Sequence, residues 1–402
     1  MKLTDKLRRF AAEPKSAQTQ EQTADLAFLQ GQVVTNPFGS YYLIERTFAL
    51  ADRHGHLQLG QILEINPPNL ALAAKDEAVN QFQLEQTLFF DTETTGLAGG
   101  TGTLAFLVGV GFISGDQFVV RQYLMRDYHE EAAMLYDIYR LVQDFTVLVS
   151  YNGKSFDWPL LKDRFILARF EPLCKRWVHL DLLYPARRLW RETLPDCSLH
   201  TIEQYVLKVV REQDIPGSEV PQRYFDFVRT KRGELLGDVI AHNRSDILSL
   251  AALMAQIDQI VARSAAELDS GALCSALAKL YLEHKQWDQA AEYLHQAVQL
   301  AESRASRLDS LSKLALIYRR QQRWEQATGI WRFLAEENGD IQSCEELAKY
   351  YEHVRKDFVK AKQAATSGLA MALSRDRRLV PAFEYRLKRL ERKLLKQQAL
   401  SS

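Results

Sequence analysis

Two acidic residues, separated by one position, stand at the end of a short apolar run. Residues 87–90 (Thr-Leu-Phe-Phe) are typical of a buried strand, and Asp91 and Glu93 follow directly. Because side chains at positions i and i+2 of a strand share one face, the two carboxylates should project from the same side. Adjacent buried carboxylates repel each other unless a cation joins them, and hard oxygen ligands suit Mg²⁺ or Mn²⁺. The pair therefore indicates a metal site.

A third acidic residue, Asp157, follows another apolar run and a polar turn. Residues 146–150 (Thr-Val-Leu-Val-Ser) are typical of a buried strand, and residues 151–156 (Tyr-Asn-Gly-Lys-Ser-Phe) provide the turn. Aspartate is also common at the N-terminus of a helix, where it favours the unpaired amides and the helix dipole. Taken alone, Asp157 is better explained by helix initiation than by catalysis.

Two pairs of histidine and aspartate complete the candidates. His242 and Asp246 lie four residues apart in a segment with helical periodicity, so their side chains should share one helix face. A pair of this kind is most often a satisfied hydrogen bond. His179 and Asp181 lie in a strand-like segment. We interpret them mainly as polar residues at a strand end, with Asp181 a weaker fifth carboxylate candidate.

The elements that must position these side chains follow from periodicity and turn signals. Strands are expected at residues 87–90, 103–113, 117–124, 146–150 and 178–182, and helices at residues 128–145, 156–168 and 234–262. Three strands joined by hairpin-like links, then helix, strand, helix and strand, predict an α/β domain with a mixed five-stranded sheet flanked by helices. The glycine-rich residues 98–102 lack a following helix and a Walker lysine, so we expect a link between strands rather than a phosphate loop.

A repeated pattern replaces the strand signals after residue 265. The copies are Tyr281, Trp287 and Ala290, then Tyr318, Trp324 and Ala327, then Tyr351, Phe358 and Ala361. The alanines are 37 and 34 residues apart. These copies resemble tetratricopeptide-like helical hairpins, in which small and aromatic residues at fixed offsets let paired helices pack closely.

The chain is therefore predicted to have four parts. Residues 1–25 are expected to be a flexible N-terminal tail, and residues 26–86 an extension whose role the sequence does not reveal. Residues 87–262 hold the candidate site, and residues 263–402 form an all-α helical-repeat domain that ends in a basic helix.

Taken in order, the motifs resemble the DnaQ-like DEDD superfamily of ribonuclease-H-like 3′–5′ exonucleases. The resemblance rests on Phe-Asp-Thr-Glu-Thr-Thr-Gly-Leu at residues 90–97, on Asp157 after an Asn-Gly-x-x-Phe segment, and on Asp246 four residues after a histidine. Within this superfamily, residues 151–157 and the attached repeats resemble the YprB-like branch. The chain departs from the family in one respect: histidine-type members usually place the histidine five residues before the last aspartate, and a spacing of four is that of the tyrosine type.

The resemblance implies a ribonuclease-H-like domain that binds two divalent ions, Mg²⁺ or Mn²⁺. Their ligands would be Asp91, Glu93, Asp157 and Asp246, and His242 would be the base that activates water. The reaction would release nucleoside 5′-monophosphates from the 3′ end of single-stranded DNA or RNA. The candidate substrate-binding residues are Thr94, Gly96, Leu97, Asn152, Lys154 and Phe156. Of these, the lysine could equally be a solvated turn residue.

Two other functions fit the same residues. A structure-specific endonuclease would share the chemistry but would also degrade circular substrates. A scaffold that recruits a partner through its repeats could carry a vestigial nuclease domain, although four carboxylates and a candidate base argue against decay. The motifs do not separate DNA from RNA, because that choice depends on contacts to the 2′-hydroxyl.

Composition predicts a soluble cytoplasmic protein that does not contact a membrane. No stretch approaches the run of about 18 apolar residues that a membrane span needs, and the N-terminal residues lack the apolar core of a secretory signal. The four cysteines lie 23, 77 and 70 residues apart, which fits neither a zinc site nor a redox motif. Reduced and mostly buried thiols are therefore expected.

The formal net charge of zero conceals an asymmetry. Residues 263–402 carry 24 basic and 18 acidic side chains, so this part has a charge of +6 and the preceding part a charge of −6. The excess includes nine Lys and Arg residues within 375–396. These residues could form a solvated face on a capping helix or contact nucleic acid. The repeats could also bind a protein partner.

Overall fold

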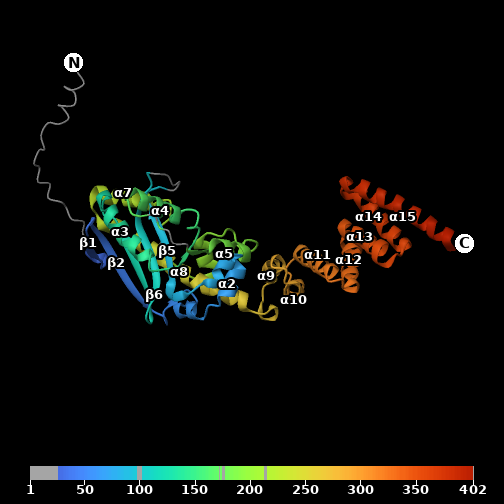
Figure 1. Cartoon of the computed structure of the whole chain (residues 1–402), viewed down its shortest axis with the longest axis horizontal. Helices are drawn as coiled ribbons and strands as arrows, with labels where there is room; N and C mark the ends of the chain where they lie inside the picture. Colours follow the sequence, from blue (N-terminus) through green and yellow to red (C-terminus); the bar gives the residue numbers. More distant parts are fainter. Residues whose placement is uncertain (1–25, 97–101, 172, 174–176, 212–214, 402) are drawn as a thin grey trace, which may run out of the picture. The chain divides into compact units, whose positions relative to one another are not determined.

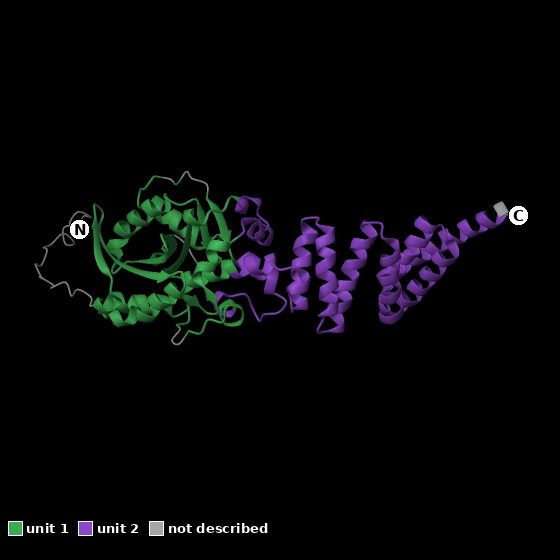
Figure 2. Cartoon of the chain, turned by 90° about the horizontal axis from the view of Figure 1, so that it is seen from below, with its two compact units in different colours: residues 1–65, 81–182, 202–255 green, residues 66–80, 183–201, 256–402 purple. Residues whose placement is uncertain are grey.

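The computed structural model of the chain describes residues 26–96, 102–171, 173, 177–211 and 215–401 (Figure 1). The predicted N-terminal tail and the predicted substrate contact Leu97 lie outside these residues. The chain divides into two compact units (Figure 2). The first contains described residues from 1–65, 81–182 and 202–255, and the second contains residues 66–80, 183–201 and 256–401.

The first unit is built on a mixed sheet of seven strands in the order β1-β2-β7-β6-β5-β8-β9. Figure 1 labels β1, β2, β5 and β6 of this sheet. The strands are β1 (Gln32–Asn36), β2 (Gly39–Ala49), β5 (Thr87–Thr94), β6 (Ala105–Ser114), β7 (Gln117–Leu124), β8 (Val147–Ser150) and β9 (Val178–Asp181). β5 pairs with β8, and β8 with β9, in parallel, and the other neighbours are antiparallel. The sheet confirms the predicted fold class, and the five expected strands lie together within it.

The two additional strands, β1 and β2, come from the N-terminal extension. They form a hairpin in which the side chain of Asn36 accepts a hydrogen bond of 3.0 Å from the amide of Phe38. Gly39 adopts a φ of +127°, which favours glycine. β1 lies at the edge of the sheet and none of its five residues is buried. Its sequence therefore has little of the alternation that identifies a half-buried strand. A separate two-stranded sheet joins β3 (Arg53–His54) to β4 (Leu57–Gln58).

The helices of the expected segments flank this sheet. They are α3 (Glu131–Val142), α4 (Asp157–Leu167) and α8 (Gly237–Ala262), with α7 (Val220–Thr230) added. The short α6 (Leu199–Ile202) belongs mainly to the second unit. α8 packs closely on β6 where β6 carries two glycines. A Cβ atom on Gly109 would lie 2.1 Å from Oδ1 of Asn243, and one on Gly111 would lie 2.5 Å from Cγ2 of Ile247. These glycines therefore set how closely α8 approaches the sheet.

The segment Gly233–Ala262 bears on the expectation that no part of the chain spans a membrane. By length and composition it is apolar enough to span a membrane, and it is the only such helix in the described part of the chain. However, 78% of its apolar window is buried inside the protein, as is typical of a core helix. Apolar residues that pack against a sheet give the same mean hydropathy as apolar residues that face lipid, so the hydropathy of this helix does not contradict the expectation.

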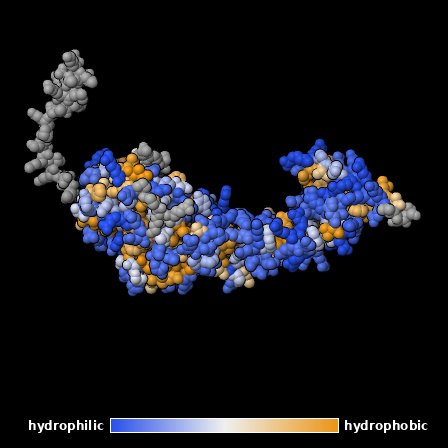
Figure 3. All heavy atoms as spheres, viewed as in Figure 1, coloured by the Kyte–Doolittle hydropathy of each residue, from blue (hydrophilic) through white to orange (hydrophobic). Residues whose placement is uncertain are grey.

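The second unit is helical. Its helices are α2 (Pro67–Ala74), α5 (Leu183–Trp190), α9 (Gly271–Glu283), α10 (Trp287–Gln299), α11 (Arg304–Arg320), α12 (Trp324–Asn338), α13 (Ile341–Lys349), α14 (Phe358–Arg375) and α15 (Val380–Ser401). α2 and α5 join the hairpins through contacts with α9. For example, Lys75 pairs with Glu283 at 2.5 Å. The visible surface of the repeats is mainly hydrophilic (Figure 3).

The three sequence copies correspond to three helical hairpins with the same turn. Lys285, Gln322 and Lys356 adopt left-handed φ values of +61°, +58° and +56°. In each copy the amide of the next residue donates to the carbonyl oxygen of the repeat tyrosine, at 2.9, 2.8 and 2.8 Å. The repeat alanines Ala290, Ala327 and Ala361 are fully buried. The helical repeats are thus real, and their tetratricopeptide-like class stays a prediction.

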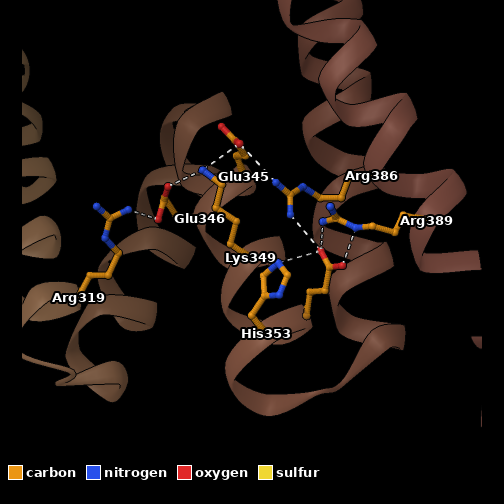
Figure 4. A network of polar contacts seen from close by, with 8 residues as sticks. Arg319, Glu345, Glu346, Lys349, His353, Arg386 and Arg389 are labelled. Atoms are coloured by element: carbon orange, nitrogen blue, oxygen red, sulfur yellow. Dashed lines mark hydrogen bonds and ion pairs between the residues drawn. The ribbon is translucent and has the colours of Figure 1, made fainter. Parts of the chain in front are cut away.

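A buried glutamate, Glu352, attaches the last helix, α15, to the third hairpin. Figure 4 labels two of its partners on α15, Arg386 and Arg389. Glu352 lies on a π-helical segment, η9 (Tyr350–Arg355), and its side chain is fully buried. Its carboxylate forms ion pairs with Arg386 at 3.0 Å, Arg389 at 2.6 Å and Lys393 at 2.9 Å. Three of the nine basic residues near the C-terminus are therefore engaged inside the fold.

Candidate active site

Asp91 and Glu93 lie near the C-terminal end of β5 and both contact α8. Nδ2 of Asn243 donates to Oδ2 of Asp91 at 2.9 Å, and Nε2 of His242 lies 4.0 Å from Oε1 of Glu93. The prediction that the two carboxylates share one face is thus confirmed. The register of β5 against β6 shifts between Glu93 and Thr94, so regular pairing is interrupted directly after the second carboxylate.

Asp157 is the first residue of α4, as the sequence suggested, but it is also joined to β5. The hydroxyl of Thr92 donates to Oδ1 of Asp157. The preceding turn is compact, because a Cβ on Gly153 would lie 2.7 Å from the side chain of Ser150. Asp157 therefore both begins α4 and lies next to the strand that carries the other carboxylates.

Asp181 holds the turn in place from the neighbouring strand. Its two oxygens accept hydrogen bonds from the amides of Asn152 at 2.7 Å and Lys154 at 3.1 Å. His179 on the same strand makes a 2.8 Å contact from Nε2 to Oγ of Ser150. Burial lowers the pKa of His179 to about 3. These contacts support the interpretation of both residues as polar groups at a strand end.

His242 and Asp246 face the same side of α8, as their spacing predicts. Nε2 of His242 lies 3.5 Å from Oδ2 of Asp246. The neighbouring residue Asn243 is fully buried, and its Oδ1 accepts a hydrogen bond of 2.9 Å from Gln122 on β7. Because Asn243 also bonds Asp91, it links the helix to the strand that carries the first carboxylate pair. The sequence contained no signal for this role.

The four carboxylates form one electrostatic cluster. Burial raises the pKa of Asp91 well above its usual value, and the charges of Asp246, Glu93 and Asp157 raise it further. Burial also raises the pKa of Asp157. A buried cluster of oxygen donors with excess negative charge fits a hard divalent cation. Even so, no three His, Cys, Asp or Glu side chains of the described residues are already arranged around a common metal position.

Arg211 occupies part of this cluster and was not predicted. Its Nη2 donates to Oδ1 of Asp246 and, at 2.6 Å, to Oε1 of Glu203, and its Nη1 lies 2.9 Å from Nδ1 of His242. Its side chain is only 8% exposed. Arg211 lies 35 residues before Asp246 in a segment without a recognisable motif. Only the folded structure brings it to the site.

Most predicted substrate residues lie at the same edge of the sheet. Thr94 is the last residue of β5 and Gly96 lies just beyond it, and the hydroxyl of Thr94 donates to the carbonyl of Gly96 at 2.8 Å. Asn152, Lys154 and Phe156 follow β8, which pairs in parallel with β5. Carboxyl ends of neighbouring parallel strands meet at one edge. Phe156 is 57% exposed, so its ring is accessible to a ligand.

Comparison with known proteins gives three findings. A family model described as RNase_H superfamily matches residues 88–257. The uncharacterized protein YprB of Bacillus subtilis is 35% identical over 366 residues, which cover 88% of this chain and 86% of that protein. The family B DNA polymerase of the archaeon Pyrobaculum calidifontis is similar over 49% of this chain and 29% of its own length, with 18% identity and a TM-score of 0.31.

Proposed function

Because the chain belongs to the family of Bacillus subtilis YprB and contains a domain of the RNase H-like nuclease superfamily, we propose that it is a metal-dependent 3′–5′ exonuclease. The substrate would be the 3′ end of single-stranded DNA or RNA, and the products nucleoside 5′-monophosphates. The observation that carries the proposal is the convergence of Asp91, Glu93, Asp246 and His242 between β5 and α8, with Asp157 beside them.

The four carboxylates would hold two divalent ions, since RNase H-like nucleases generally use such ions and the donor set suits Mg²⁺ or Mn²⁺. When bound, the ions would supply the positive charge that favours attack by water and departure of the 3′ oxygen. His242 would orient the attacking water through Nε2, which faces the carboxylates. It would act as the base once Arg211 releases Nδ1, because a guanidinium that donates to Nδ1 leaves the neutral imidazole protonated at Nε2. Asn243 would keep Asp91 in position through the 2.9 Å hydrogen bond.

The turn before α4 would bind the terminal nucleotide. The exposed ring of Phe156 can stack on a base, and Lys154 is exposed beside it and can contact a phosphate. Asn152, Thr94, Gly96 and Leu97 would complete the contacts. The hydrogen bonds that the amides of Asn152 and Lys154 donate to Asp181 would hold this turn in position next to Asp157.

Release of labelled mononucleotides from 3′-labelled single strands tests the proposal. We expect release from DNA or RNA with Mn²⁺ or Mg²⁺, and none with the Asp91→Asn variant. Asp163→Asn is the matched control, because Asp163 is exposed on α4. Equal background release by the wild type and Asp91→Asn would refute catalysis and favour a scaffold with a vestigial nuclease domain. Degradation of circular strands would favour an endonuclease.

We also propose that the protein acts in the cytoplasm, and that the repeats could recruit a protein partner. Cys274 and Cys344 are free and buried, which suits a reducing compartment. Fractionation of cells and affinity capture with the repeats intact would test these two points.

A further inference from the structure

Arg211 lies on the carboxylate that metal binding would require. Its guanidinium donates to Oδ1 of Asp246 and faces Nδ1 of His242, and the Asp246 side chain is itself only 13% exposed. A positive group on a ligand oxygen opposes a divalent cation in two ways, because it occupies a lone pair and repels the ion. In the metal-free protein the same contact neutralises Asp246, one of four carboxylates that would otherwise repel one another.

A chain of buried hydrogen bonds through Glu203, Ser249 and His54 holds Arg211 in place. Glu203 is 2% exposed and accepts from Nη2 of Arg211 at 2.6 Å. The hydroxyl of Ser249 donates to Glu203, and Nε2 of His54 lies 2.6 Å from Ser249. His54 belongs to β3 of the N-terminal extension. The extension thus contributes the last member of the hydrogen-bonded chain that holds Arg211.

Glu203 also offers the guanidinium a second position. Its Oε2 is buried and accepts no hydrogen bond from any of the described residues. If Arg211 gave up Asp246, it could donate to both oxygens of Glu203, an arrangement that suits the planar guanidinium. Displacement would therefore not leave a buried charge without a partner, which would be strongly unfavourable.

We propose that Arg211 is a built-in counter-cation that neutralises Asp246 in the metal-free protein and moves onto Glu203 when divalent ions bind. The inference rests on the proposed function, because it takes Asp246 as a metal ligand. It assigns Arg211 and Glu203 a role in metal affinity, and it gives the N-terminal extension a role in supporting them.

Titration of the full-length chain with Mn²⁺ tests this inference by calorimetry. We expect Arg211→Gln to bind Mn²⁺ at least tenfold more tightly than the wild type, because the competing charge is gone. We expect the same variant to melt at a lower temperature in EDTA and to regain stability with Mn²⁺. Arg229→Gln is the control, because Arg229 is 76% exposed and pairs with Asp226 at the surface.

Glu203→Gln should change affinity in the opposite direction. Without the charge of Glu203, Arg211 has no second position and holds Asp246 more firmly, so Mn²⁺ should bind at least tenfold more weakly. This variant keeps the inference testable if Arg211→Gln does not fold. Unchanged affinity in Glu203→Gln, or affinity in Arg211→Gln no tighter than in the wild type, would overturn the inference.

The two proposals fail in different ways. If the wild type binds Mn²⁺ and Asp91→Asn does not, the proposed metal site is supported. If Arg211→Gln then binds Mn²⁺ with the same affinity as the wild type, only the proposal about Arg211 is overturned. If the wild type and Arg211→Gln both bind no Mn²⁺, the proposed metal site fails and the counter-cation fails with it.

Discussion

Replacing Glu352 with glutamine should release α15 from the third helical hairpin. The fully buried carboxylate of Glu352 pairs with Arg386, Arg389 and Lys393, all on α15. Figure 4 labels Arg386 and Arg389. Glutamine keeps the size of the side chain and one acceptor oxygen but removes the negative charge. Three cations would then face a neutral group in a partly buried site, which is unfavourable.

The size of the effect follows from the pKa of Glu352. Burial alone would raise this pKa, but hydrogen bonds and charges from Arg389 and Lys393 outweigh burial and lower it from 4.5 to about 2. A difference of this size corresponds to about 3 kcal/mol in favour of the ionised, docked form. We therefore expect the free energy of opening of α15 to fall by about 3 kcal/mol in Glu352→Gln.

Amide hydrogen exchange of peptides from α15 measures this opening directly. A loss of about 3 kcal/mol should lower protection on the order of 100-fold. Glu391→Gln is the matched control on the same helix. Glu391 pairs with Lys362 at 2.9 Å, with side-chain exposures of 52% and 42%, so its loss should cost less than about 1 kcal/mol. Protection in Glu352→Gln equal to that in the control would refute the reasoning.

The stabilising effect of Glu352 should also depend on pH. Because the pKa in the folded protein is lowered, the contribution is fully present above about pH 4.5 and is lost as the pH falls towards 2. The difference in urea stability between the wild type and Glu352→Gln should therefore shrink as the pH is lowered from 5 to 2. A difference that stays constant over this range would show that the charge of Glu352 is not the cause.

Three further changes test the active site. Asp91→Asn should raise the melting temperature in EDTA at neutral pH. The pKa of Asp91 is raised in the folded protein, so its ionised form destabilises the fold at any pH above the usual carboxyl pKa. An unchanged melting temperature would contradict the repulsion among the carboxylates. Gly109→Ala should destabilise the first unit by about 1–3 kcal/mol in urea and slow nucleotide release, because its Cβ would meet Asn243; full activity would contradict this contact. Asp181→Ala should cost about 2–3 kcal/mol in urea and raise KM, because two amides of the turn lose their acceptor; an unchanged KM would separate the turn from substrate binding.

The sequence predicts the parts of the site that depend on local periodicity. A period of two placed Asp91 and Glu93 on one face of a strand, and a spacing of four placed His242 and Asp246 on one face of a helix. The structure bears out both relations. Each holds within a single element, so no knowledge of the tertiary packing is needed.

The unpredicted parts depend on contacts between distant segments. Arg211 reaches Asp246 across 35 residues and Asn243 reaches Asp91 across 152 residues. No periodicity or motif connects such pairs, because their contact depends on how α8 crosses the sheet. The glycines of β6 were visible in the sequence, but their consequence, the close approach of α8, is defined only by the packed helix.

The basic C-terminal residues show why net charge is a weak guide to partners. Arg386, Arg389 and Lys393 neutralise Glu352 inside the fold. Arg375 donates to the carbonyl oxygens of Asn338 and Gly339, and Arg378 pairs with Asp376. Lys388, Arg392 and Lys396 remain exposed along α15. Truncation near residue 374 would remove the basic residues that pair within the fold as well as the exposed ones. A loss of nucleic-acid binding by the truncated chain could therefore not be separated from a loss of folding. Replacing only the three exposed residues keeps the ion pairs of Glu352, so it isolates any contact between α15 and nucleic acid.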